Sequence, residues 1–364
     1  MKIVHTEASC GWGGQEIRIL EESLGMMERG HDVVLLCPAE ARIRAEAQRR
    51  GVPVGALPIG RKRLAGMLAL RQWLKRHPCD VINTHSSTDS WLAALACKTL
   101  PRAPAVVRTR HISAPIPKNA ASRWLYNGAV RHVVTTGEAL RQQLIGQHEV
   151  APDRVTSVPT GIDTVRFSPG NPNDRAAARS ARGLDPAGHY LGIVATLRSW
   201  KGHLYLLEAF AGLDLPEWSL VVVGEGPMRE PIEHKIAELG LAGRVRLVGQ
   251  QDKPEEWLRA LDVFCLPSYA NEGVPQAILQ AMLTSLPIVT TPVGAILEAV
   301  SDNETALVVP PRDAKALGTA IRRLVDDSQL AARLGEAARR KAIDRFSREA
   351  MLDRMENIFR QVCP

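Results

Sequence analysis

Short runs of apolar residues alternate along the chain with longer stretches in which apolar residues recur every three or four positions. The short runs predict buried strands, and the longer stretches predict amphipathic helices. In the first half the predicted strands are residues 2–6, 32–37, 81–85, 105–110 and 132–136. In the second half they are residues 190–196, 219–224, 245–249, 262–268 and 287–291. Strands alternating with helices form parallel sheets covered on both faces, so the expected fold class is α/β.

The pattern restarts after residues 167–174, FSPGNPND, whose Pro, Gly and Asn are typical of a linker. We therefore expect two Rossmann-like domains facing each other across a cleft, residues 1–168 and residues 169–347. The final predicted helix, within residues 348–364, is expected to pack back on the first domain. In open α/β sheets ligands bind beyond the carboxyl ends of the strands, which directs attention to the turns there.

Composition narrows the class of protein. The chain has 364 residues, 45% of them hydrophobic, which exceeds one ordinary core and fits two domains. It has no run of about 18 apolar residues, and its opening residues resemble a strand more than a signal peptide. Six cysteines lack CxxC spacing, and no cluster has metal-ligand spacing. We expect a cytoplasmic protein without a metal site or disulfide framework.

The net charge of +7 is unevenly distributed. Residues 1–165 contain 22 Lys and Arg against 14 Asp and Glu, whereas the remainder contains 24 against 25. This asymmetry indicates that the first half meets an anionic partner. A nucleic acid is disfavoured, because aromatic residues make up only 4% and no nucleic-acid-binding motif is present.

A glycine-rich turn, GWGGQE at residues 11–16, follows the first predicted strand. Glycines allow close approach of a ligand, and the next helix begins with N–H groups that suit an anion. The spacing is not GxGxxG, and the second strand ends in Cys37 and Pro38 without an acidic residue, so a dinucleotide site is disfavoured. A plain tight turn is the alternative.

Two basic residues, Arg198 and Lys201, lie in the turn after the first strand of the second half. An arginine fork and a lysine point charge together suit a diphosphate. The alternative is that both are solvated surface residues.

A third turn contains Glu272, Gly273, Val274 and Pro275 and leads into a helix. Pro275 suits the first helical turn, so backbone N–H groups nearby are expected to be available to an anionic leaving group. Glu272 would accept hydrogen bonds from sugar hydroxyls, or alternatively only cap the helix. Gln280 lies further along the same helix.

Taken together, these turns resemble a known family. Residues 268–282, SYANEGVPQAILQAM, are similar to the E-G-x-P/F-x4-E-A signature of retaining, GT-B-fold, nucleotide-sugar-dependent glycosyltransferases of family four (glycosyl transferases group 1). Supporting matches occur in the family's order through nearly the whole chain: GWGGQE, VINTHSS (81–87), TTGEALR (135–141), VPTGIDTVRFSP (158–169), ATLRSWKG (195–202) and VVVGEGP (221–227).

The resemblance implies roles for these positions. Arg198 and Lys201 match the residues that hold the donor diphosphate, and Glu272 matches the glutamate that contacts the donor sugar. His111 resembles the family histidine near the reaction centre, the alternative being a helix-capping or surface histidine. The implied catalytic residues are His111, Glu272, Arg198 and Lys201. The implied donor-binding residues are Gly13, Gly14, Arg198, Lys201, Gly249, Gln250, Glu272, Gly273, Val274, Pro275 and Gln280.

Two positions depart from the family pattern. Gln280 stands where a second glutamate usually holds the ribose hydroxyls, and a neutral acceptor gives up the charge-assisted part of that bond. Thr160 replaces the usual Asn in a turn expected to be structural. His85, at the end of another strand, is equally compatible with facing the acceptor or with a structural role.

The implied activity is transfer of a sugar, with retention, from a nucleoside diphosphate sugar to a glycan or lipid-linked acceptor, without a metal ion or other cofactor. Cell-envelope polysaccharide or lipopolysaccharide biosynthesis is the expected setting. A nucleotide-sugar epimerase of the same architecture and a non-catalytic sugar-nucleotide-binding protein are the alternatives.

Part of the basic excess flanks residues 64–74, LAGMLALRQWL, as Arg61, Lys62 and Arg63 on one side and Lys75 and Arg76 on the other. This segment is compatible with a helix lying on an anionic membrane, which suggests peripheral association with the inner face. A packed surface helix with solvated charges is the alternative, slightly favoured on the sequence.

Overall fold

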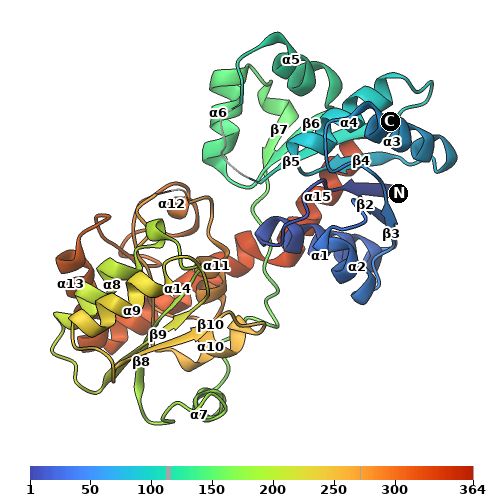
Figure 1. The fold of residues 1–364 in the computed structure, drawn as a ribbon. Helices are drawn as coiled ribbons and strands as arrows, with labels where there is room; N and C mark the ends of the chain where they lie inside the picture. The colour runs from blue at the N-terminus through green and yellow to red at the C-terminus, as the bar shows by residue number, and fades with distance from the viewer. Residues whose placement is uncertain (112–115, 271, 364) are drawn as a thin grey trace. The chain divides into compact units, whose positions relative to one another are not determined.

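The structure is a computed structural model that describes residues 1–111, 116–270 and 272–363. Its internal contacts divide the chain into two compact units. The first unit contains Met1–Gly161 together with Arg348–Pro364, and the second contains Ile162–Ser347. Each unit is an α/β domain built on one parallel sheet (Figure 1).

The first unit contains a seven-stranded sheet in the order β3-β2-β1-β4-β5-β6-β7, with every neighbouring pair parallel. Its strands are β1 (Lys2–Thr6), β2 (Asp32–Cys37), β3 (Val54–Ala56), β4 (Val81–Thr84), β5 (Ala105–Arg110), β6 (His132–Thr135) and β7 (Val155–Ser157). Its helices are α1 (Gly14–Glu28), α2 (Arg42–Arg49), α3 (Leu64–Arg76), α4 (Ser87–Lys98), α5 (Ala120–Arg123), η1 (Trp124–Ala129), α6 (Glu138–His148), η2 (Pro152–Arg154) and α15 (Arg348–Val362).

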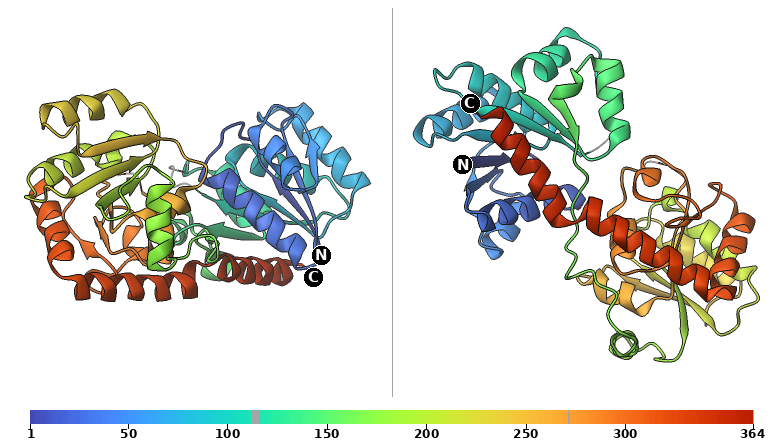
Figure 2. Two further views of the ribbon diagram at one scale, coloured as in Figure 1. Left: turned by 90° about the horizontal axis from the view of Figure 1, so that it is seen from below. Right: turned by 180° about the vertical axis from the view of Figure 1, so that it is seen from behind.

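The C-terminal helix α15 belongs to the first unit although the chain reaches it from the second. Its Met351, Met355 and Phe359 are buried in one hydrophobic cluster with Ile3 of β1 and with valines of β2, β4, β5 and β6. Figure 2 shows α15 lying along this sheet, with the two chain termini near each other. Helix α15 therefore covers one face of the first sheet.

The second unit contains a six-stranded parallel sheet in the order β10-β9-β8-β11-β12-β13. Its strands are β8 (His189–Val194), β9 (Trp218–Val223), β10 (Val245–Gly249), β11 (Val263–Leu266), β12 (Ile288–Thr290) and β13 (Leu307–Val308). Its helices are α7 (Pro172–Ser180), η3 (Ser199–Lys201), α8 (His203–Ala211), α9 (Arg229–Glu238), α10 (Pro254–Ala260), α11 (Gln276–Leu283), α12 (Ile296–Ala299), α13 (Ala314–Asp326) and α14 (Ser328–Phe346).

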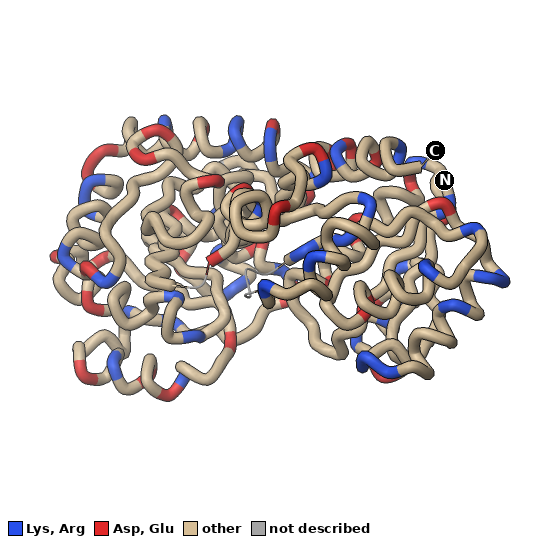
Figure 3. Tube along the Cα trace, turned by 90° about the horizontal axis from the view of Figure 1, so that it is seen from above, with Lys and Arg blue, Asp and Glu red and all other residues tan. Residues whose placement is uncertain are grey.

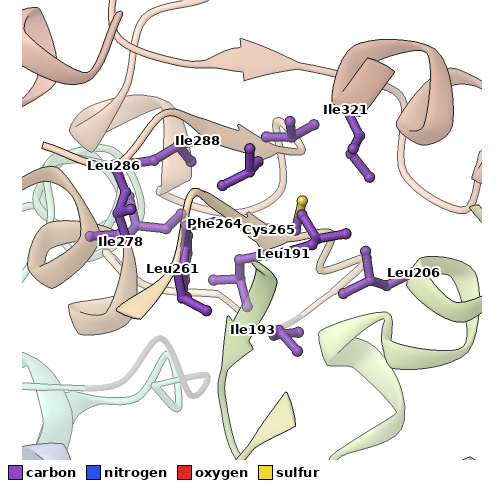
Figure 4. Close-up of a cluster of buried hydrophobic side chains, with 14 of the residues drawn as sticks. Leu191, Ile193, Leu206, Leu261, Phe264, Cys265, Ile278, Leu286, Ile288 and Ile321 are labelled. Carbon is purple, nitrogen blue, oxygen red and sulfur yellow. The ribbon is translucent and has the colours of Figure 1, made fainter. Parts of the chain in front are cut away.

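The core of the second unit lies between this sheet and its helices. Leu191 and Phe264 come from the two central strands, and Ile278 of α11 and Ile321 of α13 pack on them (Figure 4). All four side chains are fully buried. Strands β8 and β11 are therefore held rigidly, which fixes the starting points of the turns that follow them.

The segment between the units differs from the predicted boundary after residue 168. Ile162 and Phe167 are buried in the hydrophobic core of the second unit, and the backbone N–H of Ile162 donates to the carbonyl oxygen of Phe346 at 2.9 Å. The second unit begins at Ile162, because Ile162, before the predicted linker, and Phe167, its first residue, both pack there.

Helix α3 corresponds to the segment proposed to lie on a membrane. It buries Gly66, Leu70 and Leu74 within the first unit, while Leu64 and Leu68 are 68% and 49% exposed. None of the helices in the described parts of the chain is long and apolar enough to cross a membrane.

Basic and acidic residues are interspersed along α14 and α15 (Figure 3).

Candidate active site

In the second unit the turns after β8 and β11 meet at the carboxyl edge of the sheet. Strand β8 is the point at which the strand order reverses, and β11 is its neighbour on the other side. Such a switch point is where open α/β sheets bind their ligands. Arg198 and Lys201 follow β8, and Glu272 follows β11. The fold therefore brings these three predicted site residues to one edge.

An ion pair joins the two turns. Nζ of Lys201 lies 2.6 Å from Oε1 of Glu272, and the hydroxyl of Ser268 donates to the same oxygen at 2.5 Å. The side chain of Glu272 is only 5% exposed and that of Lys201 17% exposed. Glu272 is thus held by two donors rather than acting as a helix cap, and Lys201 has a protein partner that sequence reasoning did not foresee.

Backbone contacts also hold the two turns together. The N–H of Tyr269 donates to the carbonyl oxygen of Trp200 at 2.8 Å. Gly202 has φ +79°, and a Cβ atom there would lie 2.1 Å from the carbonyl oxygen of Pro267. A glycine is therefore required at this position both by its left-handed backbone and by the closeness of the second turn.

Other predicted donor-binding residues of the second unit lie in the turns and the helix that follow these strands. Arg198 and Gly273 are exposed, and Gln250 is exposed directly after Gly249 at the end of β10. The half-buried Gln280 lies in α11. These positions suit contact with a ligand, and their roles stay predictions.

The expected place of Pro275 in the first helical turn is wrong. Helix α11 begins at Gln276, and Pro275 is its N-cap with an extended backbone, φ −72° and ψ 123°. Its carbonyl oxygen accepts hydrogen bonds from the N–H groups of Ile278 and Leu279. The predicted helix, QAILQAML at residues 276–283, agrees with α11, and Pro275 lies one position before its first turn because a proline ring suits an extended residue as well as a helical one.

In the first unit three histidine rings form a continuous hydrogen-bonded row. Nδ1 of His5 lies 2.9 Å from Nε2 of His85, and Nδ1 of His85 lies 3.0 Å from Nε2 of His111. The rings come from β1 and from the turns after β4 and β5. His85 and His111, singled out separately from the sequence, are therefore in direct contact, and His5 is a member that sequence reasoning missed.

Burial keeps this row uncharged. It lowers the pKa of His5 to about 3 and the pKa values of His85 and His111 well below their usual range. A neutral imidazole has one donor and one acceptor nitrogen, so the tautomer of each ring dictates that of the next. The position of the proton on His111 is thus coupled to His5.

The glycine-rich turn is anchored by a buried acid. Glu7 accepts hydrogen bonds from the side-chain amide of Gln15 and from the N–H of Ser9, and burial followed by the nearby Asp89 raises its pKa to about 8. Gly13 is the N-cap of α1 in extended conformation, and Gly14 is the first residue of that helix. An extended backbone accepts any residue, so the conformation does not require glycine at position 13.

His85 and His111 also line a cavity of about 470 Å³ in the first unit. Arg108 and Arg110 of β5 and Lys62 contribute to its wall. Sequence reasoning did not select Arg108 or Arg110, although their alternation along one strand, R-T-R, was visible. In the described residues, no three His, Cys, Asp or Glu side chains are grouped so as to hold a metal ion.

Comparison with known families divides the chain in the same two parts. Residues 12–166 match the family described as Glycosyltransferase Family 4, and residues 174–341 match the family described as Glycosyl transferases group 1. Among curated relatives, the lipopolysaccharide core biosynthesis mannosyltransferase LpsB of Rhizobium meliloti (strain 1021) is 36% identical over 176 residues. That match covers 46% of this chain and 49% of LpsB, so it spans about half the length of the relative.

Solved structures share the fold over the whole chain. A glycosyltransferase from Rickettsia africae ESF-5 has a TM-score of 0.89 at 20% identity, covering 99% of this chain and 98% of that one. Anabaena Alr3699/HepE, in complex with UDP, has a TM-score of 0.87 at 20% identity, covering 99% of this chain and all of that one. At this level of identity the likeness shows the fold.

Proposed function

The chain belongs to the GT-B-fold glycosyltransferases of these two families, and we propose that it transfers a sugar, with retention, from a nucleoside diphosphate sugar to a glycan or lipid-linked acceptor. The donor proposal is supported by HepE, which has been solved in complex with UDP-glucose. A role in cell-envelope glycan synthesis is supported by LpsB, whose name assigns it to the lipopolysaccharide core.

The ion pair between Lys201 and Glu272 is the observation that carries this proposal. It places a cation and a carboxylate together at the switch point of the second sheet, where a donor has both a diphosphate and a sugar to be held. A lysine ammonium has three protons, so Lys201 can keep Glu272 as a partner while donating to a phosphate oxygen. Glu272 in turn accepts hydrogen bonds from sugar hydroxyls.

Departure of the diphosphate is the step that needs stabilisation, because negative charge develops on its oxygens. In the proposed mechanism Arg198 and Lys201 supply preorganised positive charge, so that no metal ion or other cofactor is required. His111 contacts the transferred sugar, as the family resemblance implies. The backbone at Gly249 and Gln250 holds the base, and the family resemblance assigns Gly13 and Gly14 a role in donor binding.

The experiment that tests this proposal is turnover of R198A with a panel of nucleoside diphosphate sugars and glycan acceptors. We expect kcat to fall at least about tenfold, the effect of losing one donor to a developing oxyanion. The control R340A removes an arginine that is 72% exposed on α14 and should leave kcat unchanged. Unchanged turnover in R198A would remove Arg198 from the mechanism. Release of an epimerised sugar without acceptor would contradict glycosyl transfer.

We also propose that α3 contacts an anionic membrane surface. The supporting observation is that Leu64 and Leu68 are exposed, near the exposed Arg61 and Arg63. Flotation with anionic liposomes at low salt should carry the chain upward, and L64S/L68S should abolish this. L297S, which removes a leucine 51% exposed in the second unit, is the control. Absence of flotation by the unmodified chain would end the proposal.

A further inference from the structure

Among the described residues, the cavity of about 470 Å³ in the first unit is lined by three cationic side chains. Its size lies in the range of roughly 300–1,000 Å³ that holds small molecules. Its polar lining includes Lys62, Ser86, Ser87, Arg108, Arg110 and Asn119. None of the described residues that line it is Asp or Glu. A wall lined by cations has a positive potential that attracts anions.

Arg108 is the most unusual residue of this wall. It is 5% exposed, and burial lowers its pKa. Its guanidinium lies 4.6 Å from the ring centroid of Tyr126, and the described residues offer it no hydrogen bond or ion pair. Buried charges are ordinarily paired, because removing an ion from water costs several kcal/mol. The unsatisfied fork thus points to a partner from outside the protein.

The nearest acid does not fill that role. Asp89 is fully buried and accepts hydrogen bonds from the hydroxyl of Thr6 at 2.7 Å, from the N–H of His85 at 2.9 Å and from the N–H of Ser86 at 2.8 Å. Its oxygens are therefore committed to the turn after β4. They provide no hydrogen bond to Arg108.

Two further cations, Lys62 and Arg110, line the same wall. Nζ of Lys62 donates to the hydroxyl of Ser87 at 3.1 Å, and its pKa is lowered by burial and then by Arg108. The guanidinium of Arg110 donates to the hydroxyl of Tyr126 at 3.1 Å. Arg108 contacts the face of the same ring, so Tyr126 positions both guanidinium groups on one side of β5.

We propose that this cavity is a binding site for an oxyanion, the phosphate or carboxylate group of an anionic acceptor. A guanidinium fork matches two oxygens of either group, and Lys62 adds a point charge. Identification of the ligand as the acceptor rests on the proposed sugar transfer. The anion site itself stands on the cavity, and it can be tested without any donor.

The test is thermal unfolding of the full chain during titration with sodium phosphate and, separately, sodium acetate, with chloride keeping the ionic strength constant. Binding to the folded state raises the melting temperature with ligand concentration and yields an apparent Kd. The variants are R108M, which removes the buried cation, and K62Q, which removes a cation at an exposed position. R108M and K62Q are each measured in an R198A background, because the site proposed at Arg198 would also bind phosphate.

In this background we expect R108M to raise the apparent Kd of the bound anion at least about tenfold and K62Q to raise it less. Stabilisation by phosphate alone identifies a phosphorylated acceptor, and stabilisation by acetate alone identifies a carboxylated one. Stabilisation that persists in both R108M and K62Q, or is already lost in R198A alone, overturns the cavity as an anion site. Failure of sugar transfer with an intact phosphate response would overturn the proposed function alone.

Discussion

Nδ1 of His85 lies 3.0 Å from Nε2 of His111, so two histidines separated by 26 residues in sequence share a hydrogen bond at the edge of the first sheet. His85 in turn meets His5 at 2.9 Å. Because burial keeps all three rings neutral, the row has only two hydrogen-bonding arrangements, with all protons directed toward His111 or all toward His5. The proposed catalytic histidine is therefore one end of a coupled group.

The stability of the chain should depend on pH through His5. Its pKa is about 3 in the folded chain and about 6.5 when unfolded, so below pH 6.5 only the unfolded chain binds this proton. The free energy of unfolding contributed by His5 is complete above pH 6.5 and is lost as the pH falls toward 3. In H5N, the slope of unfolding free energy against pH between about 4 and 6 should be smaller by up to about 1.4 kcal/mol per pH unit.

Urea unfolding at several pH values measures this slope. The raised pKa values of Glu7, about 8, and Glu22, about 7, act in the opposite direction, because a buried neutral acid is stabilised by acidification. Both acids are present in either protein, so the difference isolates His5. The control H234N removes an exposed histidine from α9. Equal slopes in H5N and the unmodified chain would contradict a neutral His5.

The ion pair in the second unit should show energetic coupling. Among the described residues, K201M leaves the nearly buried Glu272 with Ser268 as its side-chain donor, and we expect a loss of about 1–3 kcal/mol in unfolding free energy. E272Q should be milder, and K201M/E272Q should be less destabilised than the sum of the single variants. Additive effects would indicate that the two side chains do not interact in solution.

The same variants test whether Glu272 binds the sugar and Lys201 the diphosphate of the donor. E272Q is expected to leave the Kd of the nucleoside diphosphate nearly unchanged while weakening binding of the complete nucleotide sugar. K201M should weaken both, since its ammonium is assigned to the diphosphate. Calorimetric titration with UDP and UDP-glucose as probes makes this comparison, and a uniform effect of E272Q on both probes would contradict its assignment to the sugar.

Gly202 and Gly240 form a matched pair for the close approach of the two turns. Both have positive φ, +79° and +66°, but a Cβ at Gly240 meets nothing within 4 Å whereas one at Gly202 meets Pro267. G240A should cost about 1 kcal/mol from the left-handed backbone alone. G202A should cost more, roughly 3 kcal/mol, and should also lower kcat because the turn carrying Glu272 must move. Equal thermal stability of the two variants would contradict this.

Q280E restores the acidic residue usual in the family. A carboxylate accepts a hydrogen bond about twice as strongly as a neutral amide, so we expect the Kd of a nucleotide with a free ribose diol to fall several-fold. A 2′,3′-dideoxy nucleotide is the control and should show no gain. Weaker binding of the diol in Q280E would place Gln280 away from the ribose.

Much of the fold could be predicted because its central strands are continuous apolar runs between turn residues. Sequence analysis missed three strands, β3, β7 and β13. Each has two or three residues and lies at the edge of its sheet. Such strands are defined by pairing with the adjacent strand rather than by their own apolar pattern. The sequence pattern therefore does not reveal these three strands.

The residues of the candidate site also fall into those that the sequence could predict and those that it could not. Arg198, Lys201 and Glu272 could be found because each follows a recognisable strand, and the sheet order brings those strand ends together. His5 and Arg108 could not, because their importance depends on what lies across the sheet. His5 acquires a partner only when β1 pairs with β4, and the unsatisfied charge of Arg108 is visible only once its surroundings are known.

The place of α15 has a consequence for synthesis of the chain. A ribosome completes every strand of both sheets before it makes the helix that covers β1 and its neighbours. During that interval, Ile3, Val81 and Val107 lack the apolar partners that Met351, Met355 and Phe359 provide. The second unit is one continuous segment and can fold before α15 is made, whereas the first unit cannot complete its core until then. Until α15 is made, the uncovered face of the first sheet is the surface that a chaperone would bind or through which nascent chains would associate.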